Sequence, residues 1–478
     1  MDLRIQSING VKWTTFSTVF KTILQLIQLM ILARFLDKSD FGILAILMLF
    51  VSFSQVFVDF GIGKAIVHYQ NISRRELSTL YWINILFGFL TYFILFLVSG
   101  FIADFYNEPL LSGYINLIGL VLIIQSFGLQ FDTLFQKSLS FNIIAKIEIV
   151  ATTVSFLSAL LLVFNGFGIF SLIYPIIIMA SIKALLLILF GLKYHKPQFI
   201  FRIKEISKYI SFGSYSVGNA VVSNISAQMD TILIGKFLGT EILGLYSILK
   251  ELILRPSQII SPIVTKVAFP TMSKVNNDLK TVKNMYLKII NYVSSITFPI
   301  YIATIILAPE IISIFLGDKW LDGVLIFQIL AIWAMFFSIG NPVGSLVMAV
   351  GKPQVEMYWN STRLFYMPLV IYISSFWGEV GIVVGMLIIS VLLYIPAWYF
   401  LVFKLCGATF KEYFNSSFKA LYISVIVGSV VYITIQFVPN ILYIKLSFGL
   451  SLGAVLIFFL NKYLNRDFYE AMIGMVRK

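Results

Sequence analysis

The sequence predicts an all-α polytopic membrane protein with about fourteen transmembrane helices. Of its 478 residues, 59% are hydrophobic and only 12% are charged, and the mean hydropathy is +0.94. Soluble domains carry about twice that share of charged residues. Apolar runs of spanning length recur along the whole chain, and the segments between them are too short to house a soluble catalytic domain.

About 20 apolar residues cross a bilayer as a helix. The runs of this kind lie at 13–36, 41–63, 78–103, 113–134, 146–165, 168–190, 208–235, 241–270, 286–316, 323–350, 357–376, 380–403, 418–438 and 440–462. The first run ends without a small-residue cleavage site, so we expect a retained span and not a signal peptide.

Basic residues predict the orientation. With the N-terminus in the cytoplasm, and with residues toward the ends of the runs counted with the adjacent segment, 26 of the 35 Lys and Arg residues fall in cytoplasmic segments, five fall in outer loops and four lie within spans. This asymmetry follows the positive-inside rule and places both termini in the cytoplasm. It also accounts for the net charge of +13 without a nucleic-acid partner.

Two weak internal repeats predict a duplication. "RFLDKSDFG" (34–42) matches "KFLGTEILG" (236–244) at an offset of 202, and "FYNEPLLSG" (105–113) resembles "FLGDKWLDG" (315–323). The repeating unit is six spans, so both copies have the same orientation in the membrane. We expect an N-terminal lobe at 1–190, a cytoplasmic linker at 191–207, a C-terminal lobe at 208–403, and two further spans with a cytoplasmic tail at 404–478.

Polar residues recur on one face of the spans at 13–36 and 208–235. The first face carries Thr18, Lys21, Gln25 and Gln28, and the second carries Asn219, Ser223, Ser226 and Asp230. Spacings of three and four residues place each set on one side of a helix. Such a stripe either forms interhelical hydrogen bonds or lines a hydrated central cavity between the two predicted lobes. The lysine and the aspartate favour the cavity.

Other intramembrane charges are candidates for binding an anion or coupling to an ion. Lys183 lies in the middle of 168–190, and Lys250 and Arg255 lie in 241–270. Intramembrane cations are functional candidates by default, although Glu251 is spaced to form an intrahelical ion pair with Arg255. The candidates for ion coupling are the acidic residues Asp59, Asp230 and Glu251. For Asp59, the alternative to ion coupling is a structural role.

Enzymatic motifs are absent from the sequence. In "FVDFGIGKAIVHYQ" (57–70), Gly63 and Lys64 lack the glycine and the Ser or Thr that a Walker loop requires. The two histidines, His68 and His195, are far apart, and the single cysteine, Cys406, has no partner for a metal site. No cofactor and no metal are expected.

Four segments resemble the Wzx-type polysaccharide flippases of the multidrug/oligosaccharidyl-lipid/polysaccharide exporter superfamily, and most of all their colanic-acid and teichuronic-acid exporter subgroup. They are "SINGVKWTTFSTVFKTILQLIQLMILARFLDKSDFG" (7–42), "FVDFGIGKAIVHYQNISRRELSTLYWIN" (57–84), "FQKSLSFNIIAKIEI" (135–149) and "LGLYSILKEL" (243–252).

The resemblance implies two six-helix lobes around a central cavity, with two further helices beside them. It implies a bacterial cytoplasmic-membrane protein that moves undecaprenyl-diphosphate-linked oligosaccharide across the bilayer by alternating access, with membrane lipids and polysaccharide polymerase and chain-length proteins as partners. Lys21, Lys250 and Arg255 fit the family's cationic cavity, and Asp59–Gly61 fits a structural motif of the family. The alternatives are a cation/drug antiporter of the same superfamily and a membrane glycan polymerase.

Overall fold

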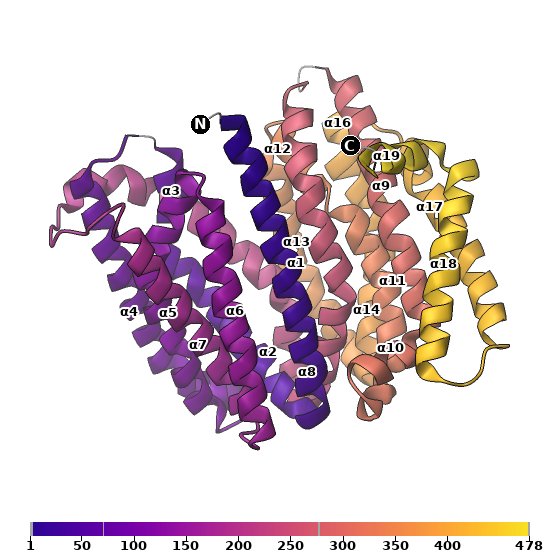
Figure 1. The fold of residues 1–478 in the computed structure, drawn as a ribbon, viewed down its shortest axis with the longest axis horizontal. Helices are drawn as coiled ribbons and strands as arrows, with labels where there is room; N and C mark the ends of the chain where they lie inside the picture. Colours follow the sequence, from indigo (N-terminus) through magenta and orange to yellow (C-terminus); the bar gives the residue numbers. More distant parts are fainter. Residues whose placement is uncertain (1–2, 70, 276–277, 477–478) are drawn as a thin grey trace. The chain divides into compact units, whose positions relative to one another are not determined.

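The computed structural model describes residues 3–69, 71–275 and 278–476, and in this part of the chain all regular secondary structure is helical, without strands. It divides into two compact units, Met1–Gly244 and Leu245–Lys478. Figure 1 shows the helices of each unit, coloured along the chain. The predicted all-α class is confirmed.

The first unit consists of long helices joined by short loops (Figure 1). They are α1 (Leu3–Phe35), α2 (Lys38–Asp59), α3 (Ile62–His68), α4 (Arg74–Tyr106), α5 (Leu111–Lys137), α6 (Phe141–Phe164), α7 (Phe170–Gly191), a 3-10 turn (Ile203–Ile206) and the first part of α8 (Ser207–Ser273). Helix α5 packs against α4 and α7, and α6 packs against α1 and α7.

The second unit begins within α8 and contains more short helices. They are α9 (Leu279–Ile306), α10 (Ala308–Phe315), a 3-10 turn (Asp318–Gly323), α11 (Val324–Gly340), α12 (Val343–Ala349), α13 (Pro353–Ser375), α14 (Gly378–Leu392), α15 (Tyr394–Trp398), a π-helical turn (Tyr399–Phe403), α16 (Lys404–Cys406), α17 (Phe410–Ile435), α18 (Leu442–Leu464) and α19 (Arg466–Val476). Helix α9 packs against α11 and α17.

Each predicted span coincides with one helix or with consecutive helices, but the count of fourteen is not confirmed. In the described part of the chain, eleven helices are long and apolar enough to cross a membrane. The count is twelve if Gly378–Leu392 and Tyr394–Cys406, which meet at 44°, form one span. Helix α13 is not among them, and its first half carries the polar residues Glu356, Asn360 and Arg363.

Helix α8 contains a sharp break. Its only residue with non-helical dihedral angles is Gly239, at φ 83° and ψ 178°, a conformation that is open mainly to glycine. The break separates the predicted spans 208–235 and 241–270. The segment before it clusters with the first unit, which ends at Gly244, whereas the predicted second lobe begins at residue 208. The division into two six-span lobes stays a prediction.

Two glycines of the sequence repeat bring backbone into contact with backbone. A Cβ atom on Gly42 would overlap the carbonyl oxygen of Thr240, and a Cβ atom on Gly244 would overlap that of Lys38. At the offset of 202, Gly42 corresponds to Gly244 and Lys38 corresponds to Thr240. A local two-fold rotation therefore exchanges the two contacts. We name this contact the glycine crossing. It is direct structural support for the repeat at 34–42 and 236–244.

The segment after α7, predicted as the linker 191–207, is held against the start of α4. Trp82 Nε1 donates to the Gln198 carbonyl at 2.9 Å, and the Gln198 amide donates to Ser78 Oγ at 3.0 Å. Thr79 Oγ1 donates to the Ile200 carbonyl at 3.2 Å. These side chains satisfy backbone groups that the irregular segment cannot pair by itself.

His195 in this segment predicts a pH dependence of stability. Burial, together with the positive charge of Arg74, lowers the pKa of His195 below its ordinary value, and its Nε2 has no hydrogen-bond partner among the described residues. The unfolded chain therefore binds a proton more readily than the folded chain. Stability from this group is complete above about pH 6.5 and is lost as the pH falls through the folded pKa.

We expect the melting temperature of the purified protein to fall between pH 7.5 and pH 5, and to fall less in His195→Gln. The matched control is His68→Gln, because His68 is exposed at the end of α3. If His195→Gln and the wild-type protein show the same pH dependence, His195 does not contribute to it.

Candidate functional site

Two lysines and two carboxylates from four helices meet inside the first unit. Lys21 Nζ on α1 lies 2.6 Å from Glu148 Oε2 on α6, and Lys183 Nζ on α7 lies 3.8 Å from Glu148 Oε1. Lys183 Nζ also lies 3.5 Å from Asp132 Oδ2 on α5. We name these four residues the charge cluster. Glu148 bridges the two lysines, so the cluster holds an anion between two cations.

The pairing follows from the cost of burying charge. The side chains of Lys21 and Glu148 are 28% and 23% exposed, and that of Asp132 is 17% exposed. Charges withdrawn from water to this extent need a partner or a hydrated cavity. The sequence places Asp132 and Glu148 near span ends but does not show that they meet Lys183 and Lys21.

The polar stripe on α1 does not form interhelical hydrogen bonds through its threonine. Thr18 Oγ1 donates to the Thr14 carbonyl of its own helix at 2.7 Å. Thr18 and Gln25 are exposed, and Gln28 is half-buried. Lys21 of the same stripe donates to Glu148 on α6 at 2.6 Å, so the stripe is paired with α6 at Lys21 and exposed at Thr18 and Gln25. The stripe therefore has the exposure that a cavity lining requires, although its role stays a prediction.

The matching stripe on α8 is more enclosed. Ser226 and Asp230 are buried and Ser223 is half-buried, while the side chain of Asn219 lies outside the described residues. An Asp230 carboxylate oxygen accepts the amide of Thr231 at 3.0 Å. Asp230 is therefore placed inside the first unit, as an ion-coupling residue would be, and that role stays a proposal.

The cationic group on the second part of α8 contains the predicted intrahelical ion pair. Arg255 Nη2 donates to Glu251 Oε1 four residues earlier, and the Arg255 side chain is 15% exposed. Lys250 Nζ lies 5.4 Å from the centre of the Tyr246 ring, in cation–π contact. The pairing with Arg255 leaves less reason to assign Glu251 to ion coupling. The substrate-binding roles of Lys250 and Arg255 stay predictions.

Asp59 lies at the turn between α2 and α3. Phe60 and Gly61 both adopt left-handed conformations, at φ 44° and 67°, so the chain ends α2 and begins α3 within two residues. Asp59 Oδ1 accepts the Gly63 amide at 3.1 Å, which satisfies a free donor in the first turn of α3. This contact supports the structural alternative for Asp59.

We expect Asp59→Ala to lower the free energy of unfolding by about 1 kcal/mol, the usual cost of losing a side chain that caps a helix. Asp59→Asn keeps an acceptor and should lose less. Thermal melting of the purified variants checks the stability. A variant that melts like the wild-type protein and yet transports nothing would instead assign Asp59 to ion coupling.

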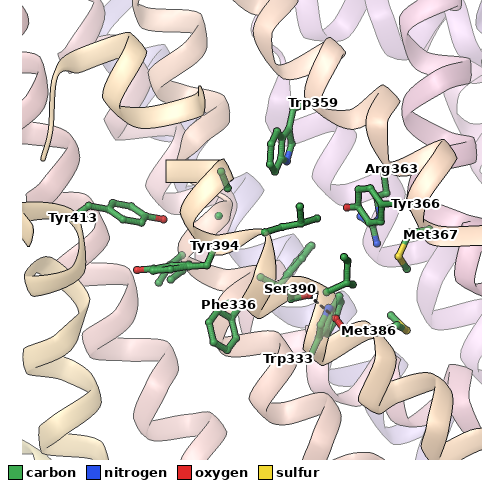
Figure 2. A pocket seen from close by; sticks show the side chains of 16 residues that line it. Trp333, Phe336, Trp359, Arg363, Tyr366, Met367, Met386, Ser390, Tyr394 and Tyr413 are labelled. Atoms are coloured by element: carbon green, nitrogen blue, oxygen red, sulfur yellow. Dashed lines mark hydrogen bonds between the residues drawn. The ribbon is translucent and has the colours of Figure 1, made fainter. Parts of the chain in front are cut away.

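A further cation, Arg363, lies in the middle of α13 and was not among the predicted site residues. The count of basic residues in the sequence analysis includes Arg363 in the cytoplasmic segment before the predicted span 357–376. It lines a pocket of the second unit together with aromatic side chains (Figure 2). Its position seven residues inside the predicted span was the signal in the sequence that could have found it.

The fold identifies the class of protein. The structure superposes on "Lipid II flippase MurJ, inward closed conformation" with a TM-score of 0.78 and 16% sequence identity, over 96% of this chain and 99% of that chain. It superposes on an inward-facing multidrug resistance MATE family transporter of the MOP superfamily with a TM-score of 0.56 and 13% identity, over 86% and 95%. The chain is a multi-pass helical membrane protein with the fold of these transporters.

Sequence comparison gives the family. The profile of the family described as "Polysaccharide biosynthesis protein" matches residues 31–325, and the chain belongs to this family. Lipopolysaccharide biosynthesis protein WzxC of Escherichia coli K12 is 27% identical over 89% of this chain and 86% of its own length. An uncharacterised membrane protein in the cps region of Klebsiella pneumoniae is 30% identical over 87% of both chains. The expected resemblance is confirmed.

Proposed function

We propose that this protein is a flippase of the bacterial cytoplasmic membrane. It translocates undecaprenyl-diphosphate-linked oligosaccharide for the synthesis of a surface polysaccharide, by alternating access and without changing covalent bonds. Family membership and the fold shared with a lipid II flippase support this proposal. Membrane lipids surround it, and a polysaccharide polymerase and chain-length proteins act on its product.

The charge cluster carries the proposal. Lys21 and Lys183 approach Glu148 from α1 and α7, at 2.6 and 3.8 Å. A diphosphate that leaves water loses its hydration and needs cations to replace it. The two ammonium groups provide this charge once the substrate displaces Glu148. When the product leaves, Glu148 returns to the lysines, and Glu148 and Asp132 together neutralise Lys21 and Lys183, so the empty protein does not hold uncompensated charge.

The two alternatives fit this geometry less well. A cation/drug antiporter needs carboxylates that are available to a cation, but in the charge cluster Glu148 and Asp132 are each paired with a lysine. A glycan polymerase needs a site for both donor and acceptor. The segments between the helices in the described part of the chain are too short to form an additional domain for them.

Proteoliposomes test the proposal directly. Purified protein is reconstituted with a fluorescent undecaprenyl-diphosphate-linked oligosaccharide, and an impermeant glycosidase added outside reports its appearance in the outer leaflet. We expect translocation that depends on the protein. Equal accessibility in empty liposomes, or no translocation by correctly folded protein, would contradict the proposed function.

The orientation is tested by cysteine labelling after Cys406, which is buried, has been replaced by alanine. A cysteine at Lys196 or Lys280 should react with an impermeant maleimide only after the membrane is opened. A cysteine at Leu110, which is 69% exposed in the loop after α4, should react in intact cells. These outcomes follow from the asymmetry of basic residues, and the reverse pattern would show that both termini are outside.

A further inference from the structure

The segment between α7 and α8 exposes a group of large aromatic side chains. Phe199 is 78% exposed, Tyr194 is 57% exposed and Phe201 is 51% exposed. The ring centroids of Phe199 and Phe201 lie 5.3 Å apart, and that of Trp82 on α4 lies 5.0 Å from that of Phe199. We name residues 194–202 the aromatic loop. Apolar side chains that gather on a surface in this way mark an interaction site.

The aromatic loop is fixed in place by α4. The backbone groups of alternate residues, at 198, 200 and 202, pair with side chains of that helix. The last of these contacts is the Arg202 amide, which donates to Thr79 Oγ1 at 3.3 Å. The residues between them, Phe199 and Phe201, are left exposed. The exposed rings therefore belong to a backbone that is held in one position.

The position of Trp82 on α4 sets the depth of the loop. Helix α4 has 33 residues, so it is about 50 Å long, whereas the hydrocarbon core of a bilayer is about 30 Å thick. Trp82 lies about 12 Å from the start of the helix, where the mainly polar residues of 73–79 give way to the mainly apolar residues of 83–103. Tryptophan at such a boundary lies at the level of the lipid headgroups. The contact with Phe199 places the aromatic loop at the same level.

Four exposed cations accompany the aromatic loop without an acidic partner in the described part of the chain. They are Arg74 and Arg75 at the start of α4, Lys193 just before the loop and Lys196 within it. The acids nearby are already paired, since Glu76 lies 3.2 Å from Lys208 and Glu205 lies 2.9 Å from Arg202. This surface therefore carries a surplus of positive charge that suits an anionic partner.

Exposed aromatic rings at another helix end lack such cations. Phe376 and Trp377, which follow α13, are 72% and 71% exposed. The charged residue nearest to them in the sequence is Glu379, and no Lys or Arg occurs between residues 364 and 403. Aromatic rings alone suit any membrane interface, so the cations distinguish the aromatic loop.

We propose that the aromatic loop, with its four cations, binds anionic phospholipid at the predicted cytoplasmic surface of the membrane. Phe199 and Phe201 contact the acyl chains below the headgroups, and the cations contact the phosphates. Anionic headgroups attract basic segments beside a membrane, and aromatic side chains prefer the interface itself. The loop connects α7 to α8, so bound lipid holds this connection at the membrane surface. The inference does not depend on which substrate the protein transports.

Quenching of Trp82 fluorescence tests the lipid preference. Full-length protein is reconstituted into phosphatidylcholine nanodiscs that contain a small fraction of either dibrominated phosphatidylglycerol or dibrominated phosphatidylcholine. Brominated acyl chains quench the tryptophans that they touch, and subtracting the signal of Trp82→Phe isolates Trp82. We expect the anionic lipid to be preferred about tenfold or more, because each Lys or Arg near a membrane surface contributes about fivefold. Equal quenching by the two lipids overturns the proposal.

Charge variants locate the preference. Lys193→Gln combined with Lys196→Gln should reduce the preference about fivefold or more and leave quenching by phosphatidylcholine unchanged. The matched control combines Lys280→Gln with Lys352→Gln, which removes the same charge from exposed positions of the second unit. Thermal melting establishes that each protein is folded. No reduction in the first double variant, or an equal reduction in the control, overturns the proposal.

A tryptophan introduced by Phe199→Trp tests the depth of the loop. The substitution is made in the Trp82→Phe background, and subtracting that background isolates the new reporter. We expect brominated phospholipid to quench it, and acrylamide, which stays in water, to quench it little. The competing occupant is an acidic segment of a cytoplasmic protein. In that case acrylamide quenches the reporter strongly and brominated lipid does not, and the proposal is wrong.

Discussion

Replacing Lys21 with alanine is expected to reduce translocation about tenfold or more. The change removes one of the two cations that replace the hydration of the diphosphate, and tenfold corresponds to about 1.4 kcal/mol. It also leaves Glu148 with Lys183 alone, at 3.8 Å. Lys21→Arg keeps the charge and should retain more activity. Initial rates in proteoliposomes measure the effect, with protein amounts matched.

The partner of Lys21 distinguishes substrate binding from simple stabilisation. Glu148→Gln removes the competing carboxylate, so it should tighten binding of the diphosphate and slow its release. Lys280→Ala is the matched control, because Lys280 is exposed at the start of α9. Lys283, also on α9, is unsuitable as a control because its Nζ forms an ion pair with Glu412 Oε1 at 2.8 Å, and removing it would break that pair. Full activity of a folded Lys21→Ala variant would refute the role of the charge cluster.

Alanine at either glycine of the crossing is expected to prevent normal folding. A methyl group on Gly42 or Gly244 would occupy the position of a backbone carbonyl oxygen, and backbone cannot move aside as a flexible side chain can. We expect a loss of about 3 kcal/mol or more in the free energy of unfolding. Thermal melting in detergent and the amount of protein in the membrane measure it.

Gly100→Ala is the control for this prediction. Gly100 lies within α4, and no atom lies within 4 Å of the position its Cβ would occupy. Alanine there should be neutral or slightly stabilising, because it restricts the unfolded chain. If Gly42→Ala melts at the same temperature as Gly100→Ala, the two segments are not in backbone contact.

Much of the fold could be predicted because the bilayer imposes it. A spanning helix needs a continuous apolar run, and such runs are local in sequence, so each predicted span coincides with helix. It was harder to predict which helical segments span the membrane and where they end. The break at Gly239 falls between the predicted runs 208–235 and 241–270, but the run predicted at 357–376 lies in α13, which carries Glu356 and Arg363 and is not among the helices apolar enough to span.

The candidate site was less predictable because its contacts are between distant segments. The sequence indicates that Lys21 and Lys183 are intramembrane cations, but not that Glu148 lies between them, since 127 residues separate Lys21 from Glu148. The intrahelical pair of Glu251 and Arg255 was predictable, because four residues on one helix fix the distance. Arg363 was missed because a charge near a predicted span end resembles a residue of the adjacent loop.

The glycine crossing also bears on how a chain of this length arose. Each copy of the repeat contributes the same two elements, a glycine and the carbonyl four residues before it, at Lys38 and Gly42 and at Thr240 and Gly244. Such a contact is isologous, which is the geometry by which two identical subunits associate. An ancestor with one copy of the repeat would form this contact as a homodimer. Gene fusion would then have joined two surfaces that already recognised each other.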